Sequence, residues 1–190
     1  MGNHGGFSLD ESVRRSWYNP EAILKQAGLK EGMVFVDVGC GEGFFAMLAA
    51  QLVGDKGKVY AVDSNAATIE KLKRGAAAKN LKNIHAEVGA AEQTVFCNNC
   101  ADIVFYSMVL HDFSDPAMVL QNAKSMLKPS GVLVNLDWKK LQIPFGPPFQ
   151  IRLSEQQAAE LITQAGLTVE NVKDAGPYHY VIHAKPNNRC

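Results

Sequence analysis

The sequence predicts a single α/β domain built on a doubly wound, largely parallel sheet. Strand-like and helix-like patterns alternate along most of the 190 residues, and a glycine-rich turn joins the first strand to the helix that follows it. Apolar residues make up 47% of the chain, which suffices for one sizeable core but not for two. We therefore expect residues 1–190 to form one domain.

The predicted elements of the first two thirds of the chain alternate as a parallel sheet requires. Strands are expected at 33–38, 58–63, 83–88, 101–106 and 131–137, and helices at 43–53, 66–79 and 116–127. Asp115 and Pro116 open the last of these helices, and Pro129 with Gly131 is expected to end it. Parallel strands need crossover connections of this kind, so the pattern indicates helices packed on a parallel sheet.

The remaining third follows a different pattern. Ser154 and Gln157 form a capping box that opens a helix, and Gly166 closes it. Two strand-like runs follow at 167–172 and 178–184, and only a short turn containing Gly176 and Pro177 separates them. A connection this short allows only antiparallel pairing.

The turn after the first strand carries glycine at positions 39, 41 and 43. Gly39 permits a positive φ where the chain turns, and Gly41 leaves no Cβ between the backbone and a ligand. Gly43 is expected to let the new helix pack close to the sheet. The start of that helix presents N–H groups to an anionic group. The turn therefore indicates a site for a nucleotide-like cofactor.

Two acids flank this turn and narrow the choice of cofactor. Asp37 lies two residues before Gly39, and Asp63 ends the second predicted strand. The dinucleotide fingerprint is G-x-G-x-x-G, whereas Phe44 stands here in place of its last glycine. The Asp37 carboxylate would repel a pyrophosphate but suits the ammonium of an amino acid, and Asp63 is placed to accept two ribose hydroxyls. This combination disfavours NAD.

The pattern Asp-x-Gly-x-Gly-x-Gly, followed by a second-strand acid, resembles the class I S-adenosylmethionine-dependent methyltransferases. The resemblance implies a Rossmann-like sheet of seven strands, parallel except for one antiparallel strand from the carboxyl-terminal hairpin. It also implies S-adenosyl-L-methionine as cofactor, S-adenosyl-L-homocysteine as its product, and methyl transfer to a small-molecule acceptor. The implied cofactor-binding residues are Asp37, Gly39, Cys40, Gly41, Gly43, Asp63, Ser64, Ala90, Ala91 and Ser107.

Within this family the chain is similar to small members of the ubiquinone/menaquinone-biosynthesis type, from about Pro20 to the carboxyl terminus. The segment 89–102 lies in register with a family segment that begins Gly-Asp-Ala-Glu. Ala90 replaces the family's aspartate, which contacts the adenine amino group, at a cost on the order of 1 kcal/mol. The backbone of Ala91 would then border the adenine, and the carbonyl of Ser107 would face its amino group.

His111 is the candidate catalytic residue. It follows the fourth predicted strand, at the sheet edge where an acceptor would approach the cofactor. Imidazole titrates near neutrality, so His111 is a candidate general base; the alternative is a structural histidine that shapes the pocket. Trp17 and Tyr18, in the amino-terminal segment 1–19, are candidates to cover the pocket.

Cys97 and Cys100 form a C-x-x-C pair, which elsewhere is half of a zinc site or a redox dithiol. No second pair accompanies it, and it coincides with a turn of the related family, so an exposed turn is favoured and no metal site is predicted. Two alternatives stay open. One is an arsenite or other thiophilic methyltransferase that uses both cysteines, and the other is a non-catalytic S-adenosylmethionine-binding module.

The charges and apolar runs limit the partners. Lysine plus arginine and aspartate plus glutamate each number 19, so the chain lacks the positive field typical of nucleic-acid binding, and no nucleic-acid partner is expected. No secretory signal or membrane-length apolar run stands out, so we expect a cytoplasmic protein with reduced cysteines and no membrane insertion. The sequence leaves the acceptor and the oligomeric state open.

Overall fold

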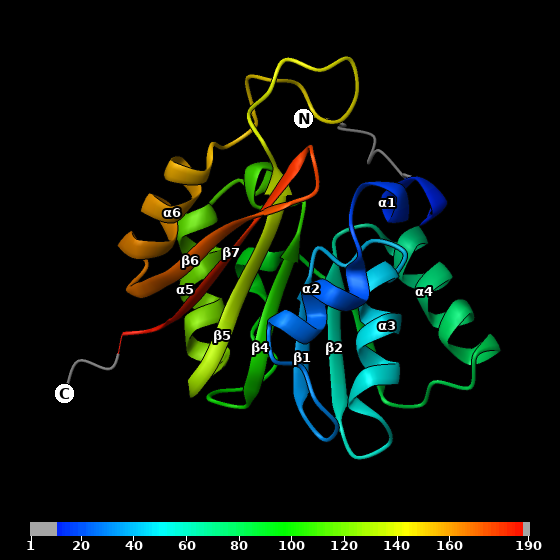
Figure 1. The fold of residues 1–190 in the computed structure, drawn as a ribbon. Helices are drawn as coiled ribbons and strands as arrows, with labels where there is room; N and C mark the ends of the chain where they lie inside the picture. The colour runs from blue at the N-terminus through cyan, green and yellow to red at the C-terminus, as the bar shows by residue number, and fades with distance from the viewer. Residues whose placement is uncertain (1–10, 188–190) are drawn as a thin grey trace.

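The computed structural model describes residues 11–187 and contains a seven-stranded sheet with helices on both faces (Figure 1). The strands are β1 (Val34–Val38), β2 (Lys58–Asp63), β3 (Ile84–Val88), β4 (Ala101–Ser107), β5 (Leu127–Trp138), β6 (Leu167–Ala175) and β7 (His179–Pro186). Their order is β3-β2-β1-β4-β5-β7-β6. Only β7 runs against the others, pairing antiparallel with β5 and β6. The predicted fold class is confirmed.

The helices are α1 (Glu11–Trp17), α2 (Pro20–Gln26), α3 (Phe44–Val53), α4 (Ala66–Ala78), α5 (Pro116–Met126) and α6 (Glu155–Gln164), with short 3-10 turns η1 (Ala91–Gln93) and η2 (Leu110–Asp112). The helix α1 lies in the segment 1–19, for which the sequence predicted only a pocket cover, and α2 follows that segment and was not predicted. The predicted caps of the last two are present: Asp115 accepts from the backbone of Met118, and Ser154 with Gln157 makes a capping box.

The predicted end of α5 was wrong by a residue, and β5 begins earlier than expected. The helix stops at Met126, and Leu127 is already extended. Pro129 disfavours helical geometry at Lys128, the residue before it, so the chain leaves the helix ahead of the proline.

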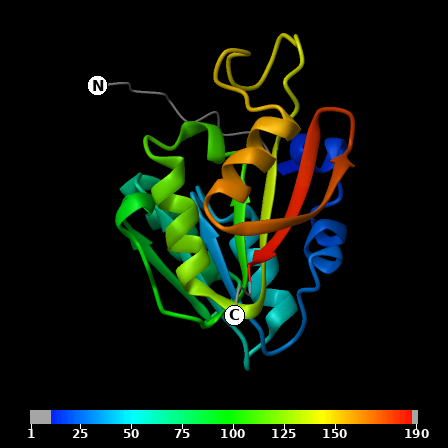
Figure 2. The same cartoon turned by 90° about the vertical axis from the view of Figure 1, so that its left-hand side faces the viewer.

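The two faces of the sheet bury separate cores. Ile103 and Phe105 of β4 pack in the core covered by α2, α3 and α4, whereas Val104 and Tyr106 pack in the core beneath α5 and α6. Side chains alternate between the faces of a strand, and both faces are covered, so β4 is apolar almost throughout. Figure 1 shows the two helical layers, and α5 and α6 face the viewer in Figure 2.

The carboxyl ends of the parallel strands form the edge that matters for function. Strand order reverses between β1 and β4, since β1 leads outward to β2 while β4 leads to β5 on the other side. Such a switch point leaves a crevice where ligands of open α/β sheets bind. The segment 139–153 rises from this edge after β5, and α1 lies at the same end of the molecule (Figure 1).

Candidate active site at the carboxyl edge of the sheet

The glycine turn after β1 adopts the positive φ angles that its residues permit, 71° at Gly39 and 86° at Gly43. A Cβ on Gly39 would lie 2.7 Å from Val109, and one on Gly43 would collide with Leu72 of α4. Gly43 thus serves helix–helix packing, which corrects the expectation that it serves packing on the sheet. A Cβ on Gly41 would meet nothing within 4 Å, so Gly41 faces open space.

Backbone hydrogen bonds hold this turn against the end of β2. The amides of Gly39 and Cys40 both donate to the carbonyl of Val62, at 2.8 and 3.0 Å. The amide of Gly41 donates to Asp63 Oδ2 at 2.9 Å. The carbonyl of Asp63 in turn accepts from Gly89 at 3.0 Å, so the chain leaves β3 beside it.

The predicted cofactor-binding residues therefore gather at the ends of four neighbouring strands. Asp37 comes from β1, and the exposed Ser64 follows β2. Ala90 and Ala91 follow β3, and Ser107 ends β4. Glycines and alanines at these ends leave backbone accessible to a ligand.

Asp37 is a buried acid without a partner. Its residue is 1% exposed, and neither carboxyl oxygen has a hydrogen-bond partner among the described residues. Burial is the main cause that raises the pKa of Asp37 to about 7, and the charge of Asp63 contributes to the rise. The backbone N–H of Ala46 and the charge of Arg14 act in the opposite direction. A buried acid of this kind is stabilised when a cation reaches it.

Further buried polar atoms lack partners at the same edge. Among residues 11–187 these include Ser107 Oγ, Asp137 Oδ2, the hydroxyl of Tyr18 and both ring nitrogens of His179. Proteins pair nearly all buried polar atoms, so a concentration of unpaired ones at one edge indicates a ligand site.

His111 lies in η2 and pairs with Asp137 at the end of β5. The distance from His111 Nδ1 to Asp137 Oδ1 is 2.8 Å, and the two side chains are 2% and 1% exposed. Burial by itself lowers the pKa of His111, but the hydrogen bond and charge of Asp137, helped by Asp112, outweigh it and hold the pKa above its ordinary value. Because a carboxylate oxygen accepts, Nδ1 donates, and in the neutral ring Nε2 keeps the lone pair.

The sequence predicted His111 as a site residue but did not predict Asp137 as its partner. The available signal was an acid at the end of the strand next to β4. It also missed Met108, which has a φ of 58° directly after β4 and donates its amide to Leu136 O at 2.7 Å. A left-handed conformation is costly for a non-glycine residue, and such residues concentrate at functional sites.

An aromatic cluster joins the amino-terminal helix to the rest of the edge. The Trp17 ring stacks on Phe145 of the segment 139–153 at 5.5 Å and meets Trp138 edge-on at 5.4 Å. It also lies 5.9 Å from Tyr178 and 5.5 Å from His179. Trp17 thus packs α1 against the carboxyl edge of the sheet, while residues 1–10 lie outside the described residues and the role as a pocket cover stays a prediction.

A buried arginine that the sequence analysis also missed shapes the segment 139–153. Arg152 is 2% exposed and donates to three carbonyls, those of Leu141, Phe145 and Pro147, at 3.0, 2.6 and 2.8 Å. One side chain therefore fixes the course of a segment that has no helix or strand of its own.

Comparison with known proteins decides the family. Residues 29–179 match the family described as "Methyltransferase domain". The chain belongs to this methyltransferase family. A solved S-adenosylmethionine-dependent methyltransferase from Aquifex aeolicus is 33% identical, with a TM-score of 0.88 over 93% of this chain and 94% of that chain. The resemblance stated from the sequence, with its cofactor, is confirmed.

Curated relatives agree with this assignment. A ubiquinone/menaquinone biosynthesis C-methyltransferase of Coxiella burnetii is 27% identical over 173 residues, which cover 90% of this chain and 66% of that protein. A demethylmenaquinone methyltransferase of Staphylococcus aureus is 29% identical over 123 residues, covering 64% of this chain and 50% of that protein. The methyltransferase chain thus spans half to about two thirds of the length of these relatives.

The cysteine pair of the methyltransferase corrects one expectation. Cys97 and Cys100 form a disulfide rather than two thiols. A left-handed Asn99, with φ of 51°, turns the chain so that the two Cα atoms lie 6.0 Å apart, within the range of disulfides. Asn98 and Asn99 are exposed, so the predicted exposed turn is present.

Residues 11–187 contain neither a candidate metal cluster nor a helix that could span a membrane. No group of three or more His, Cys, Asp or Glu side chains there is arranged to hold a metal ion. No helix in that range combines the length and apolar character needed to cross a bilayer.

Proposed function

We propose that the protein transfers a methyl group from S-adenosyl-L-methionine to a small-molecule acceptor. The observation that carries the proposal is the buried, unpartnered carboxyl of Asp37 behind a turn where Gly41 faces open space. Family membership supports the same cofactor.

The residues of this edge fit the cofactor part by part. Asp37 would take the ammonium of the methionine portion, and Gly39, Cys40, Gly41 and Gly43 would border that portion. Asp63, with Ser64 beside it, would accept the ribose hydroxyls. Ala90 and Ala91 would border the adenine, and the carbonyl of Ser107 would face its amino group. The bound cofactor supplies an electrophilic methyl group on a sulfonium.

We propose that His111 removes a proton from the acceptor. Its Nε2 carries the lone pair, while Asp137 holds the ring in that tautomer and stabilises the imidazolium that forms. Trp17 and the segment 139–153 would exclude water from this region. The acceptor is therefore a small molecule that reacts after losing a proton. Demethylmenaquinone, named in one relative, is the first compound to test.

Binding and labelling together test the proposal. Calorimetry should show that S-adenosylmethionine and S-adenosylhomocysteine bind and that NAD does not. Tighter binding of NAD than of either adenosyl ligand would refute the proposed cofactor. Incubating metabolite extracts and reduced demethylmenaquinone with cofactor labelled at the methyl group should then label one acceptor. Cofactor binding with no labelled product would favour the non-catalytic module instead.

A further inference from the structure

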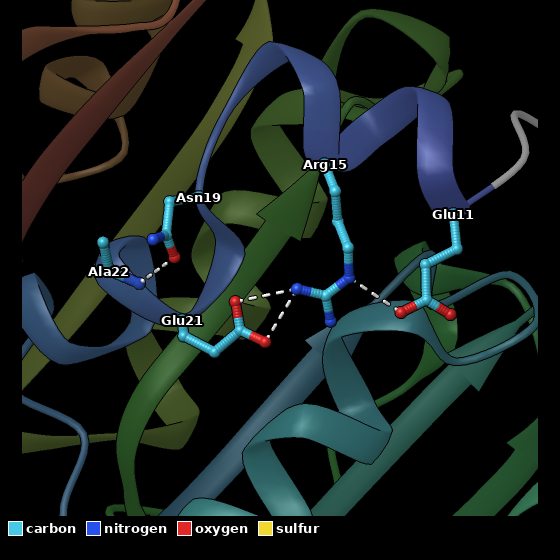
Figure 3. A network of polar contacts seen from close by, with 5 residues as sticks. All are labelled: Glu11, Arg15, Asn19, Glu21 and Ala22. Carbon is cyan, nitrogen blue, oxygen red and sulfur yellow. Dashed lines mark hydrogen bonds and ion pairs between the residues drawn. The ribbon is translucent and has the colours of Figure 1, made fainter.

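Two adjacent arginines of α1 both lie over the Phe44 ring, with guanidinium carbons 5.2 and 5.7 Å from its centre, but they differ in their hydrogen-bond partners. Arg15 points to carboxylates: its Nε donates to Glu11 at 2.9 Å, and its Nη1 donates to both oxygens of Glu21 at 2.8 and 2.9 Å (Figure 3). Glu21 belongs to α2, so these bonds tie the two helices together. Asn19 caps α2 between them by accepting from Ala22 at 2.9 Å (Figure 3). The orientation of α1 is thereby set.

Arg14 is half-buried and has no ion pair within residues 11–187. Its guanidinium carbon lies 5.2 Å from the centre of the Phe44 ring, and Phe44 is the first residue of α3, directly after Gly43. Its Nε is buried and has no hydrogen-bond partner among the described residues. A guanidinium with an unused donor therefore lies next to the glycine turn.

The charge of Arg14 acts on the buried groups of the site. Burial raises the pKa of Asp37 and of Tyr18, and the positive charge of Arg14 opposes both rises. Burial and nearby positive charges together lower the pKa of His179 to about 3, and burial is the largest cause, followed by the charge of Arg14. The three groups come from β1, the chain after α1, and β7, so Arg14 lies close to the region that they surround.

Other cations near this edge are already engaged. Lys71 pairs with Glu42 of the glycine turn at 2.6 Å, and Lys139 pairs with Asp174 at 2.8 Å. Arg152 donates to three carbonyls of the segment 139–153. Unlike these three, the Arg14 guanidinium has no hydrogen bond or ion pair among residues 11–187 and is available to a ligand.

We propose that Arg14 binds the carboxylate of the cofactor's methionine portion, across the site from Asp37. This inference rests on the proposed function. The amino-acid end of the cofactor carries both an ammonium and a carboxylate, and Asp37 complements only the ammonium. A second anion brought near Asp37 and Asp63 needs a cation, and a guanidinium binds a carboxylate with two parallel hydrogen bonds. The amino-terminal helix then recognises the cofactor as well as covering the pocket.

The contact between Arg14 and the cofactor carboxylate can be tested with a ligand that lacks this carboxylate. Calorimetry would compare S-adenosylmethionine with decarboxylated S-adenosylmethionine, which keeps the ammonium, on the wild-type protein, Arg14→Gln and Arg15→Gln. Arg14→Gln should weaken S-adenosylmethionine about 10- to 100-fold, the range for a charge-assisted hydrogen bond, and should leave the decarboxylated ligand within about 2-fold. Arg15→Gln is the matched control and should affect both ligands equally.

Two results would overturn the role of Arg14, and a third would refute the proposed function. Equal weakening of both ligands by Arg14→Gln, in a variant whose thermal unfolding matches the wild type, would make Arg14 structural and overturn it. An unchanged affinity for S-adenosylmethionine would overturn it as well. In both cases binding by the wild type leaves the proposed function intact, whereas a wild type that binds neither ligand would refute the proposed function itself.

Discussion

His111 and Asp137 come from the ends of neighbouring strands and meet at 2.8 Å although 26 residues separate them. The parallel register of β4 and β5 pairs Ser107 with Leu136, which places Asp137 one residue past the pairing. The chain after β4 turns through the left-handed Met108 and brings His111 back over this position. The pair thus depends on strand register as much as on the two residues themselves.

Replacing His111 should affect turnover more than cofactor binding. His111→Ala should lower kcat by about 10²- to 10⁴-fold if the imidazole is the general base. The base must be neutral, so wild-type kcat/KM should fall as pH drops through a pKa above 6.5. Asp137→Asn removes the carboxylate that contributes most to raising this pKa and should move the acid limb to lower pH. Normal turnover with a large loss of cofactor affinity would place His111 on the wrong side of the site.

Replacing Asp37 should stabilise the ligand-free protein while weakening the cofactor. Its pKa rises from 3.8 to about 7 on folding, so between these values the folded state binds more protons than the unfolded state. Stability therefore falls as pH rises through this window and stays reduced above it. Asp37→Asn should raise the free energy of unfolding at pH 8 by on the order of 1–3 kcal/mol, with little gain near pH 4.

Urea denaturation across this pH range, with calorimetry of S-adenosylhomocysteine binding, checks both halves of the Asp37 prediction. A variant less stable than the wild type at pH 8 would show that the carboxylate has a partner in solution.

Alanine substitutions at Gly41 and Gly43 should have different effects, since the first should weaken cofactor binding and the second should mainly destabilise the fold. Both positions have positive φ, which costs alanine about 1–2 kcal/mol. Gly43→Ala adds a collision with Leu72, and overpacking costs roughly 1–3 kcal/mol more. Gly41→Ala meets no protein atom and should fold but lose cofactor affinity. Thermal unfolding and calorimetry of the two variants test this, and wild-type affinity in Gly41→Ala would remove Gly41 from the site.

Removing the Arg152 guanidinium should loosen the segment 139–153. Arg152→Met leaves three carbonyls without their donor, at a cost of roughly 1–3 kcal/mol for each one that stays buried. Limited proteolysis should cut this segment faster, and the KM of the acceptor should rise while S-adenosylhomocysteine affinity holds. Lys140→Met changes a lysine of the same segment, partly buried and bonded to Gln157, and serves as the control. Equal cleavage of both variants would contradict the role given to Arg152.

Local patterns predicted most of this fold. The glycine turn, the caps at Asp115 and Ser154 and the closing hairpin each depend on neighbours in sequence, and each is present. The contacts of Asp137 and Arg152 could not be read in this way, because they are set by strand order and by a segment without periodicity. The disulfide depends on Asn99 taking a left-handed conformation that its sequence permits but does not require.

The docking of Trp17 has a spectroscopic consequence. The chain contains two tryptophans, and Trp17 and Trp138 are both in the aromatic cluster, with ring centres 5.4 Å apart. Tryptophan fluorescence of this protein therefore comes only from Trp17 in α1 and Trp138 at the end of β5. A stopped-flow trace recorded without any attached dye would therefore report ligand binding at this edge of the sheet.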